Sequence, residues 1–132
     1  MNYLVDTHLL LWILLSPAKI SQKVKTVLAD TESPKYVSVI SFWEISLKFL
    51  LGKLELEGVQ PEELPVFTNT AGLKILDLDS QTAASIHKLA IQKNKDSFDR
   101  MLAWQAIHNH YYLLTKDTDF AVYEKYGLKI YW

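Results

Sequence analysis

Residues 36–48 read YVSVISFWEISLK, and along this stretch the pattern changes from that of a strand to that of a helix. Residues 36–40 are apolar and largely β-branched, as in a strand that is buried on both faces of a parallel sheet. From residue 42 to residue 51, apolar residues recur at helical spacing. A strand followed by a helix is the repeating unit of an α/β protein, so this stretch indicates the fold class.

The same alternation continues on both sides of this stretch. Further strands are predicted at residues 3–5, 74–78, 111–115 and 128–132, and further helices at residues 20–30, 61–71, 80–92 and 98–109. Ser21 and Ser80 are expected to cap two of these helices, and Pro61 to begin the first turn of another. Because right-handed crossovers join successive parallel strands, we predict one α/β domain over residues 1–132, with a mostly parallel sheet covered on both faces.

Composition excludes several classes of protein. The 132 residues fit one compact domain, and 49% hydrophobic with 22% charged residues is not the composition of a disordered chain. The chain has no cysteine, which excludes disulfides, zinc–thiolate sites and cysteine nucleophiles and is compatible with a reducing cytoplasm. The net charge of −1 argues against nucleic-acid binding by overall charge, so such a role would depend on metal cations or a local patch.

The amino-terminal residues predict a soluble, cytoplasmic protein. The chain reaches Asp6 before any apolar run and carries no basic segment ahead of it, so a secretory signal peptide is not expected. The apolar run from Leu9 to Leu15 is too short to span a bilayer.

Acidic residues gather where a parallel sheet would bind a ligand, beyond the carboxyl ends of its strands. One directly follows the first predicted strand, one lies a helical turn beyond the second, and the others flank the strand at 111–115. These residues are Asp6, Glu44, Asp96, Asp99, Asp117 and Asp119. Several carboxylates at one sheet edge would repel each other and raise their own pKa values. Mg²⁺ or Mn²⁺ relieves this repulsion, prefers oxygen ligands, and activates water for attack on a phosphodiester.

Each carboxylate also has a structural interpretation. Asp6 is equally well explained as a helix N-cap, and Asp99 as a first-turn acid that the helix dipole favours. Glu44 can pair with Lys48 one turn along the helix, although its apolar neighbours indicate a buried position that requires a partner. Asp117 is also compatible with an ordinary turn.

Four blocks of sequence, in this order along the chain, resemble the PIN-domain (PilT N-terminus) family. They are YLVDTH at 3–8, SFWEISLK at 41–48 with LGKL at 51–54, DSFDRML at 96–102 and LTKDTDF at 114–120. The resemblance covers essentially the whole chain and is greatest to the VapC-like toxin ribonucleases of type II toxin–antitoxin systems.

This resemblance implies a three-layer α/β/α sandwich and RNA cleavage that depends on Mg²⁺ or Mn²⁺. The implied catalytic residues are Asp6, Glu44, Asp99 and Asp117. Asp6, Asp99 and Asp117 would hold the metal directly, while Glu44 would hold metal or orient the attacking water. The implied partners are RNA, a cognate antitoxin whose carboxyl-terminal segment occupies the active-site groove, and a second copy of the chain in a homodimer.

One block departs from the family pattern. The family reads His-Arg-Asp-Pro-Phe-Asp-Arg where this chain has NKDSFDR at residues 94–100, which puts a substrate-contacting role of that loop in doubt. Asp96 and Asp119 are second choices, because each lies close enough in sequence to exchange roles with Asp99 or Asp117. Thr115 is a further candidate, as a hydroxyl donor to the carboxylates or as an ordinary β-branched strand residue. Arg100, the only arginine, is a candidate phosphate clamp or a partner of Asp96.

Two other functions compete with a ribonuclease. A catalytically silent PIN-fold binding or scaffold module would keep the fold without binding divalent metal. A phosphoacceptor receiver domain also places acids at strand ends, but the order of Asp6, Glu44, Asp99 and Asp117 fits it poorly. A Ser–His–Asp hydrolase is not favoured, because no serine lies in a nucleophile motif.

Overall fold

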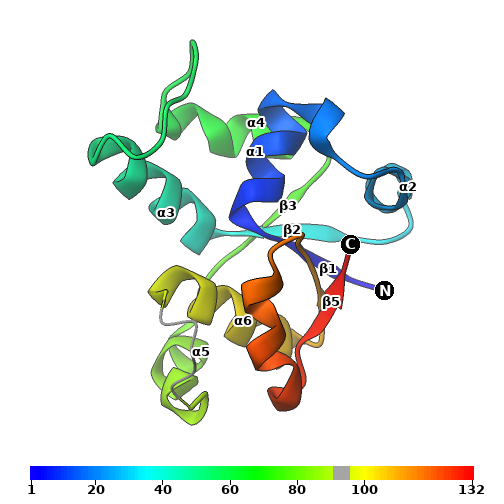
Figure 1. The fold of residues 1–132 in the computed structure, drawn as a ribbon, viewed down its shortest axis with the longest axis vertical. Helices are drawn as coiled ribbons and strands as arrows, with labels where there is room; N and C mark the ends of the chain where they lie inside the picture. Colours follow the sequence, from blue (N-terminus) through cyan, green and yellow to red (C-terminus); the bar gives the residue numbers. More distant parts are fainter. Residues whose placement is uncertain (91–95) are drawn as a thin grey trace.

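The computed structural model describes residues 1–90 and 96–132, whose strands form one five-stranded parallel sheet (Figure 1). The sheet order is β3-β2-β1-β4-β5, which confirms the predicted parallel α/β sheet. The strands are β1 (Tyr3–Val5), β2 (Lys35–Ser38), β3 (Lys74–Leu76), β4 (Tyr112–Leu114) and β5 (Lys129–Tyr131). β1 has the predicted bounds, and the other strands end before the last residue predicted for them.

Helices follow each of the first four strands. They are α1 (Thr7–Leu15), α2 (Gln22–Ala29), α3 (Val39–Leu50), α4 (Leu64–Thr70), α5 (Ser80–Ser85) and α6 (Ser97–Asn109), with 3-10 segments η1 (Pro17–Lys19), η2 (Pro61–Glu63), η3 (Ile86–Lys88) and η4 (Thr118–Tyr126). Within residues 1–90 and 96–132, no helix is both long and apolar enough to cross a membrane.

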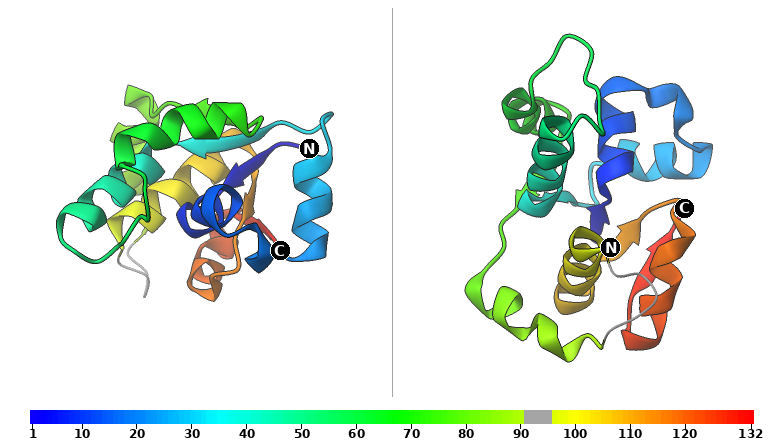
Figure 2. Two further views of the ribbon diagram at one scale, coloured as in Figure 1. Left: turned by 90° about the horizontal axis from the view of Figure 1, so that it is seen from above. Right: turned by 60° about the vertical axis from the view of Figure 1, so that its left-hand side comes forward.

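Helices cover both faces of the sheet, which gives the predicted three layers (Figure 2). Tyr3 and Val5 of β1 point into a core shared with α1, α2 and α4, where Leu10, Val24 and Leu64 are fully buried. The intervening strand residue, Leu4, points to the opposite core, which α6 and η4 close. This alternation follows from the two-residue period of a strand and makes both faces of β1 apolar.

Local hydrogen bonding explains where the structure departs from the predicted elements. The helix predicted from residue 42 begins at Val39, because the Ser38 hydroxyl caps it by accepting from Ile40 N at 3.0 Å. Ser21 caps α2 as predicted, accepting from Val24 N at 3.3 Å. The prediction for Ser80 is wrong, since Asp79 caps α5 and accepts from Thr82 N at 2.8 Å.

Three helical segments are absent from the predictions, namely α1, η1 and η4. α1 is apolar around its whole circumference and gives no helical period, and η4 has 3-10 geometry. The helix predicted over residues 80–92 is divided into α5 and η3. Residues 91 and 92 of that helix, and Asn94 and Lys95 of the NKDSFDR block, lie outside the described residues.

β1 lies next to β4, and the order in which successive strands are added to the sheet reverses between them. β2 and β3 follow β1 outward on one side, while β4 and β5 lie on the other. Val5 at the end of β1 is paired with Leu114 at the end of β4. In open α/β sheets, ligands bind outside the carboxyl ends of the strands at this switch point, so the residues after Val5 and Leu114 define the expected site.

Candidate active site

Asp6 is the first residue beyond β1, and its backbone N–H and both of its carboxylate oxygens form hydrogen bonds. Its backbone N–H donates to Leu114 O of β4 at 3.1 Å. Its Oδ1 accepts from Leu9 N at 2.7 Å and so caps α1, as one interpretation of the sequence expects. Its Oδ2 accepts from the hydroxyl of Thr115. The carboxylate is only 3% exposed, so its position is determined by these contacts.

Thr115 also connects Asp6 to Asp117. The Asp117 backbone N–H donates to Thr115 Oγ1 at 3.0 Å, while the Asp117 carboxylate caps η4 by accepting from Asp119 N at 2.9 Å. One buried hydroxyl at the end of β4 therefore positions the first residue after β1 and the loop that carries Asp117.

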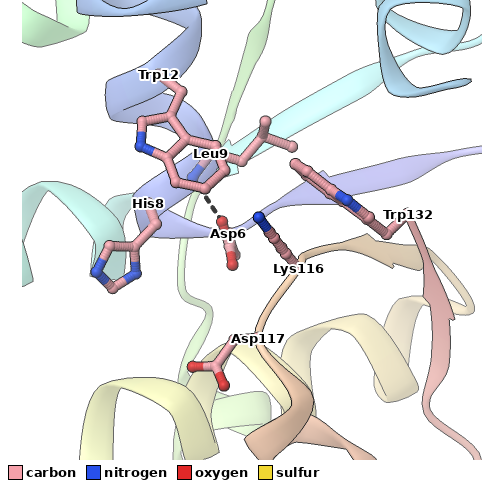
Figure 3. A pocket seen from close by; sticks show the side chains of 7 residues that line it. All are labelled: Asp6, His8, Leu9, Trp12, Lys116, Asp117 and Trp132. Atoms are coloured by element: carbon pink, nitrogen blue, oxygen red, sulfur yellow. Dashed lines mark hydrogen bonds between the residues drawn. The ribbon is translucent and has the colours of Figure 1, made fainter. Parts of the chain in front are cut away.

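Asp6 and Asp117 face one pocket of about 230 Å³ (Figure 3). The other residues that line it are His8, Leu9, Trp12, Lys116 and Trp132. In Figure 3, Asp6 and the side-chain nitrogen of Lys116 lie between the two tryptophans, and Asp117 lies below them. The pocket thus joins the ends of β1, β4 and β5 at the switch point of the sheet.

The electrostatics of Asp6 favour a bound cation. Burial raises the pKa of the Asp6 carboxyl above its usual value, and the negative charge of Asp117 raises it further. Hydrogen bonds from Thr115 and Leu9 N lower this pKa, but they do not offset the effect of burial. An ionised Asp6 is therefore destabilised in this site, and a positive charge in the pocket would relieve that cost.

Glu44 lies on α3, also buried, and both of its oxygens are engaged. The Thr7 hydroxyl donates to Oε1 at 2.7 Å, and the Lys48 ammonium lies 2.5 Å from Oε2. The hydroxyl of Ser41 lies 2.9 Å from that of Thr7. Thr7 and Glu44 line a second cavity of about 290 Å³, and the exposed His8 borders both this cavity and the pocket of Asp6.

Lys48 connects Glu44 electrostatically with the start of α6. Burial alone would lower the pKa of the Lys48 ammonium, but its hydrogen bond to Glu44 and the charge of Glu44 raise it. The negative charges of Asp96 and Asp99 add to this increase, so the pKa lies above its usual value. Asp99 is partly buried in the first turn of α6. Asp96 is exposed and caps α6, accepting from Phe98 N at 2.9 Å and Asp99 N at 3.0 Å.

The structure therefore divides the predicted carboxylates into two sets. Asp6 and Asp117 share a pocket, whereas the negative charges of Glu44 and Asp99 raise the pKa of Lys48. In the part of the chain that the structure describes, no three His, Asp or Glu side chains are arranged to hold one metal ion together. The pair Asp6 and Asp117 still fits Mg²⁺, because this ion commonly takes one or two protein carboxylates and completes its shell with water and substrate phosphate.

The sequence comparison decides the family. Residues 3–126 match the model of the PIN domain. The chain belongs to the PIN domain family. This confirms the resemblance inferred from the sequence blocks.

Solved structures with similar folds come from several bacteria. VapBC2 from Rickettsia felis, bound to a DNA fragment from its promoter, matches this PIN domain with a TM-score of 0.63 and 15% identity, over 99% of this chain and 98% of that chain. DNA-bound VapBC from Salmonella typhimurium matches with a TM-score of 0.65 and 14% identity, over 99% and 97%. VapBC-1 from nontypeable Haemophilus influenzae matches with a TM-score of 0.65 and 18% identity, over 99% and 97%. No curated protein matches the chain.

Arg100 has a structural position in this PIN domain. Its guanidinium donates to Leu89 O at 2.7 Å and to Ala90 O at 3.3 Å. These bonds attach α6 to the end of η3 and point the side chain at backbone carbonyls. Asp119 is exposed, and its backbone N–H is the donor to Asp117.

Several residues of the site carry no clear signal in the sequence. Thr7 and the terminal Trp132 become part of the site only through contacts between distant elements. Trp12 borders the Asp6 pocket, and Trp43 is 61% exposed. Trp104 is partly buried and donates its Nε1–H to Thr82 O at 3.1 Å.

Proposed function

We propose that this PIN domain is a Mg²⁺- or Mn²⁺-dependent endoribonuclease and the toxin of a type II toxin–antitoxin pair. The observation that carries the proposal is the buried carboxylate of Asp6, joined to Asp117 through Thr115 at the switch point of a parallel sheet. A buried acid with a raised pKa in a pocket marks a functional site. Ligand sites in this fold lie at the same place in the sheet.

The residues have distinct roles in this proposal. Asp6 and Asp117 would hold the metal. Asp99 would be a third ligand, or would stabilise the positive charge of Lys48. A bound divalent cation would supply charge stabilisation to the phosphodiester and lower the pKa of a water molecule. Glu44, oriented by Thr7 and Lys48, would orient the attacking water. Lys116, exposed at the rim, would attract the RNA backbone and so supply a local positive charge that the overall charge of −1 does not.

The proposed partners follow from the family and the similar structures. VapBC complexes share the fold over nearly the whole chain, which supports a cognate antitoxin bound to this PIN domain. A homodimer and a cytoplasmic location belong to the same proposal.

The test is cleavage of RNA by the purified protein with Mg²⁺ or Mn²⁺, with and without EDTA. We expect metal-dependent cleavage that Asp6→Asn and Asp117→Asn each reduce by at least about 100-fold, as for loss of a group that stabilises transition-state charge. Asp119→Asn is the matched control, because this exposed neighbour of Asp117 contributes only its backbone to the site. Full metal-dependent cleavage by a folded Asp6→Asn protein would exclude the proposal.

A further inference from the structure

Two tryptophan rings stand beside the carboxylates of the candidate site. Trp12 projects from α1, and Trp132 follows the last residue of β5. Their ring centroids lie 5.9 Å apart with an interplanar angle of 65°. Because this contact is edge-to-face and not stacked, it occupies at most one face of one ring, and both rings are only partly buried. Both also line the pocket that contains Asp6 and Asp117.

The size of the pocket limits what it can hold. Its volume of about 230 Å³ lies below the roughly 300–1,000 Å³ typical of sites for drug-sized ligands. The space therefore suits one small planar group. Trp12, Trp132 and Leu9 supply the apolar part of the lining, which comes from α1 and from the residue after β5 and lies on the side of the pocket away from Asp117.

The charges in the pocket distinguish the parts of a nucleotide. Asp6 and Asp117 would repel a phosphate that entered without a cation. A neutral, planar base is not repelled and stacks on an aromatic face. Lys116 is exposed at the rim, where it can pair with the phosphate of the same nucleotide. The arrangement therefore favours a base stacked on an open face of Trp12 or Trp132, with its phosphate near the carboxylates and Lys116.

We propose that the pocket formed by Trp12, Trp132 and Lys116 is a subsite for one unpaired nucleobase, next to the phosphodiester that is cleaved. The proposal rests on the proposed ribonuclease function and adds to it a site that holds the base of a nucleotide beside the cleaved bond. A base that stacks on Trp12 or Trp132 must leave its own helical stack, which is possible in loops and single strands but costly in a duplex.

The test measures binding of the four nucleoside 5′-monophosphates by calorimetry in the presence of Mg²⁺. Ribose 5-phosphate, which lacks the base, is the matched ligand. We expect the nucleotides to bind and to quench tryptophan fluorescence, and ribose 5-phosphate to bind much more weakly. Trp132→Ala should weaken nucleotide binding about 5- to 150-fold, which is the free energy of one base–aromatic stack converted at about 1.4 kcal/mol per tenfold change. Trp132→Phe, which keeps an aromatic face, should retain most of the affinity.

Trp43→Ala is the control variant, because Trp43 is exposed on α3 and lines other cavities. Equal binding of ribose 5-phosphate, or unchanged nucleotide binding in Trp12→Ala and Trp132→Ala, would overturn the base subsite. Should Trp132→Ala fail to fold, Trp132→Leu compared with Trp132→Phe isolates the aromatic face.

The two proposals fail in different ways. RNA cleavage by a protein that does not distinguish nucleotides from ribose 5-phosphate removes the base subsite and leaves the ribonuclease intact. Nucleotide binding that depends on Trp132, in a protein without metal-dependent cleavage, supports the base subsite and rejects the ribonuclease.

Discussion

Thr115 donates its hydroxyl hydrogen to Asp6 Oδ2, although the two residues are 109 positions apart in the sequence. The hydroxyl oxygen of Thr115 also accepts from Asp117 N at 3.0 Å. The contact with Asp6 forms because β1 and β4 are neighbours in the sheet and end at the same level, whereas the contact with Asp117 is local in the chain. Thr115 is therefore a positioning residue, which acts on the candidate chemistry through the two carboxylates that line the pocket.

Replacing Thr115 by valine tests this role, because the two side chains have similar shape. Thr115→Val removes the donor to Asp6 and the acceptor for Asp117 N, so we expect metal-dependent cleavage to fall by about 10- to 100-fold, as for loss of a partner behind a metal ligand. The apparent Mg²⁺ affinity, measured from the metal dependence of the rate, should fall in parallel.

Thr115→Ser is the control for this change, since it keeps the hydroxyl and should keep most of the activity. A merely structural Thr115 would give a different result, in which Thr115→Val lowers the melting temperature but leaves the metal dependence of the folded protein unchanged.

The raised pKa of Asp6 predicts a specific dependence of stability on pH. Burial raises this pKa in the folded protein, so the folded state takes up a proton at a higher pH than the unfolded chain does. The contribution of Asp6 to stability is therefore most favourable below the unfolded value of about 3.9, and it is lost as pH rises through the raised folded value. Metal-free Asp6→Asn should consequently be more stable than the wild type at neutral pH.

The measurement is the free energy of unfolding of both proteins in EDTA, between about pH 4 and 8. The advantage of Asp6→Asn should grow with pH, and each 1 kcal/mol corresponds to roughly 4 °C in melting temperature. Asp30 and Asp79, whose pKa values are lowered by hydrogen bonds to their carboxylates, are common to both proteins and cancel in the comparison. An advantage that does not change with pH would contradict the assignment of the raised pKa to Asp6.

The sequence predicts the sheet well and one helix poorly, for a physical reason. Strands such as Tyr3–Val5 are short apolar runs bounded by polar residues, and they are recognisable locally. Most of the apolar residues of α1 are buried or partly buried in the core, and they lie on every side of the helix. Its sequence therefore lacks the alternation of apolar and polar residues that indicates a helix. The only local sign of where α1 begins is Asp6, which is recognisable as a possible N-cap.

Some features of the candidate site are predictable from the sequence and others are not. Asp6 and Asp117 are predictable, since acids that follow parallel strands lie at one edge of the sheet. Their link through Thr115, and the meeting of Trp12 with Trp132, depend on the order of the strands. A single sequence does not contain that order, so Trp132 at the end of the chain gives no sign that it borders the carboxylates.

The Lys48 ammonium pairs with Glu44, so a cation bound near Glu44 would compete with Lys48 for its negative charge. The variant Lys48→Met leaves buried Glu44 with the neutral Thr7 donor. We expect it to lower the free energy of unfolding of the metal-free protein by about 1–2 kcal/mol, less than the cost of breaking a fully buried pair, because the Lys48 side chain is 35% exposed.

Mg²⁺ should raise the melting temperature of Lys48→Met more than that of the wild type, since the added cation then replaces the lost ammonium. Lys53→Met is the control, because exposed Lys53 borders the same cavity as Glu44. An equal response to Mg²⁺ in Lys48→Met and the wild type would show that Lys48 and the metal do not share the same negative charge.

Arg100 is predicted to stabilise the fold without contacting RNA. Its guanidinium is directed at Leu89 O and Ala90 O, and its charge lowers the pKa of Tyr123, which burial raises more strongly. Arg100→Gln should therefore lower the free energy of unfolding by about 1–3 kcal/mol, as for loss of hydrogen bonds from a charged donor. The KM for RNA should stay within about twofold, because a side chain directed at the protein's own carbonyls adds nothing to substrate binding.

Thermal unfolding and steady-state cleavage kinetics of the same preparations separate the two effects. Lys88→Gln is the matched control, since it removes one exposed positive charge from the end of η3, next to Leu89, to which Arg100 is bonded. A raised KM with unchanged stability in Arg100→Gln, and no such change in Lys88→Gln, would identify Arg100 as a phosphate clamp. In that case Arg100 must exchange its carbonyl partners for the substrate phosphate when RNA binds.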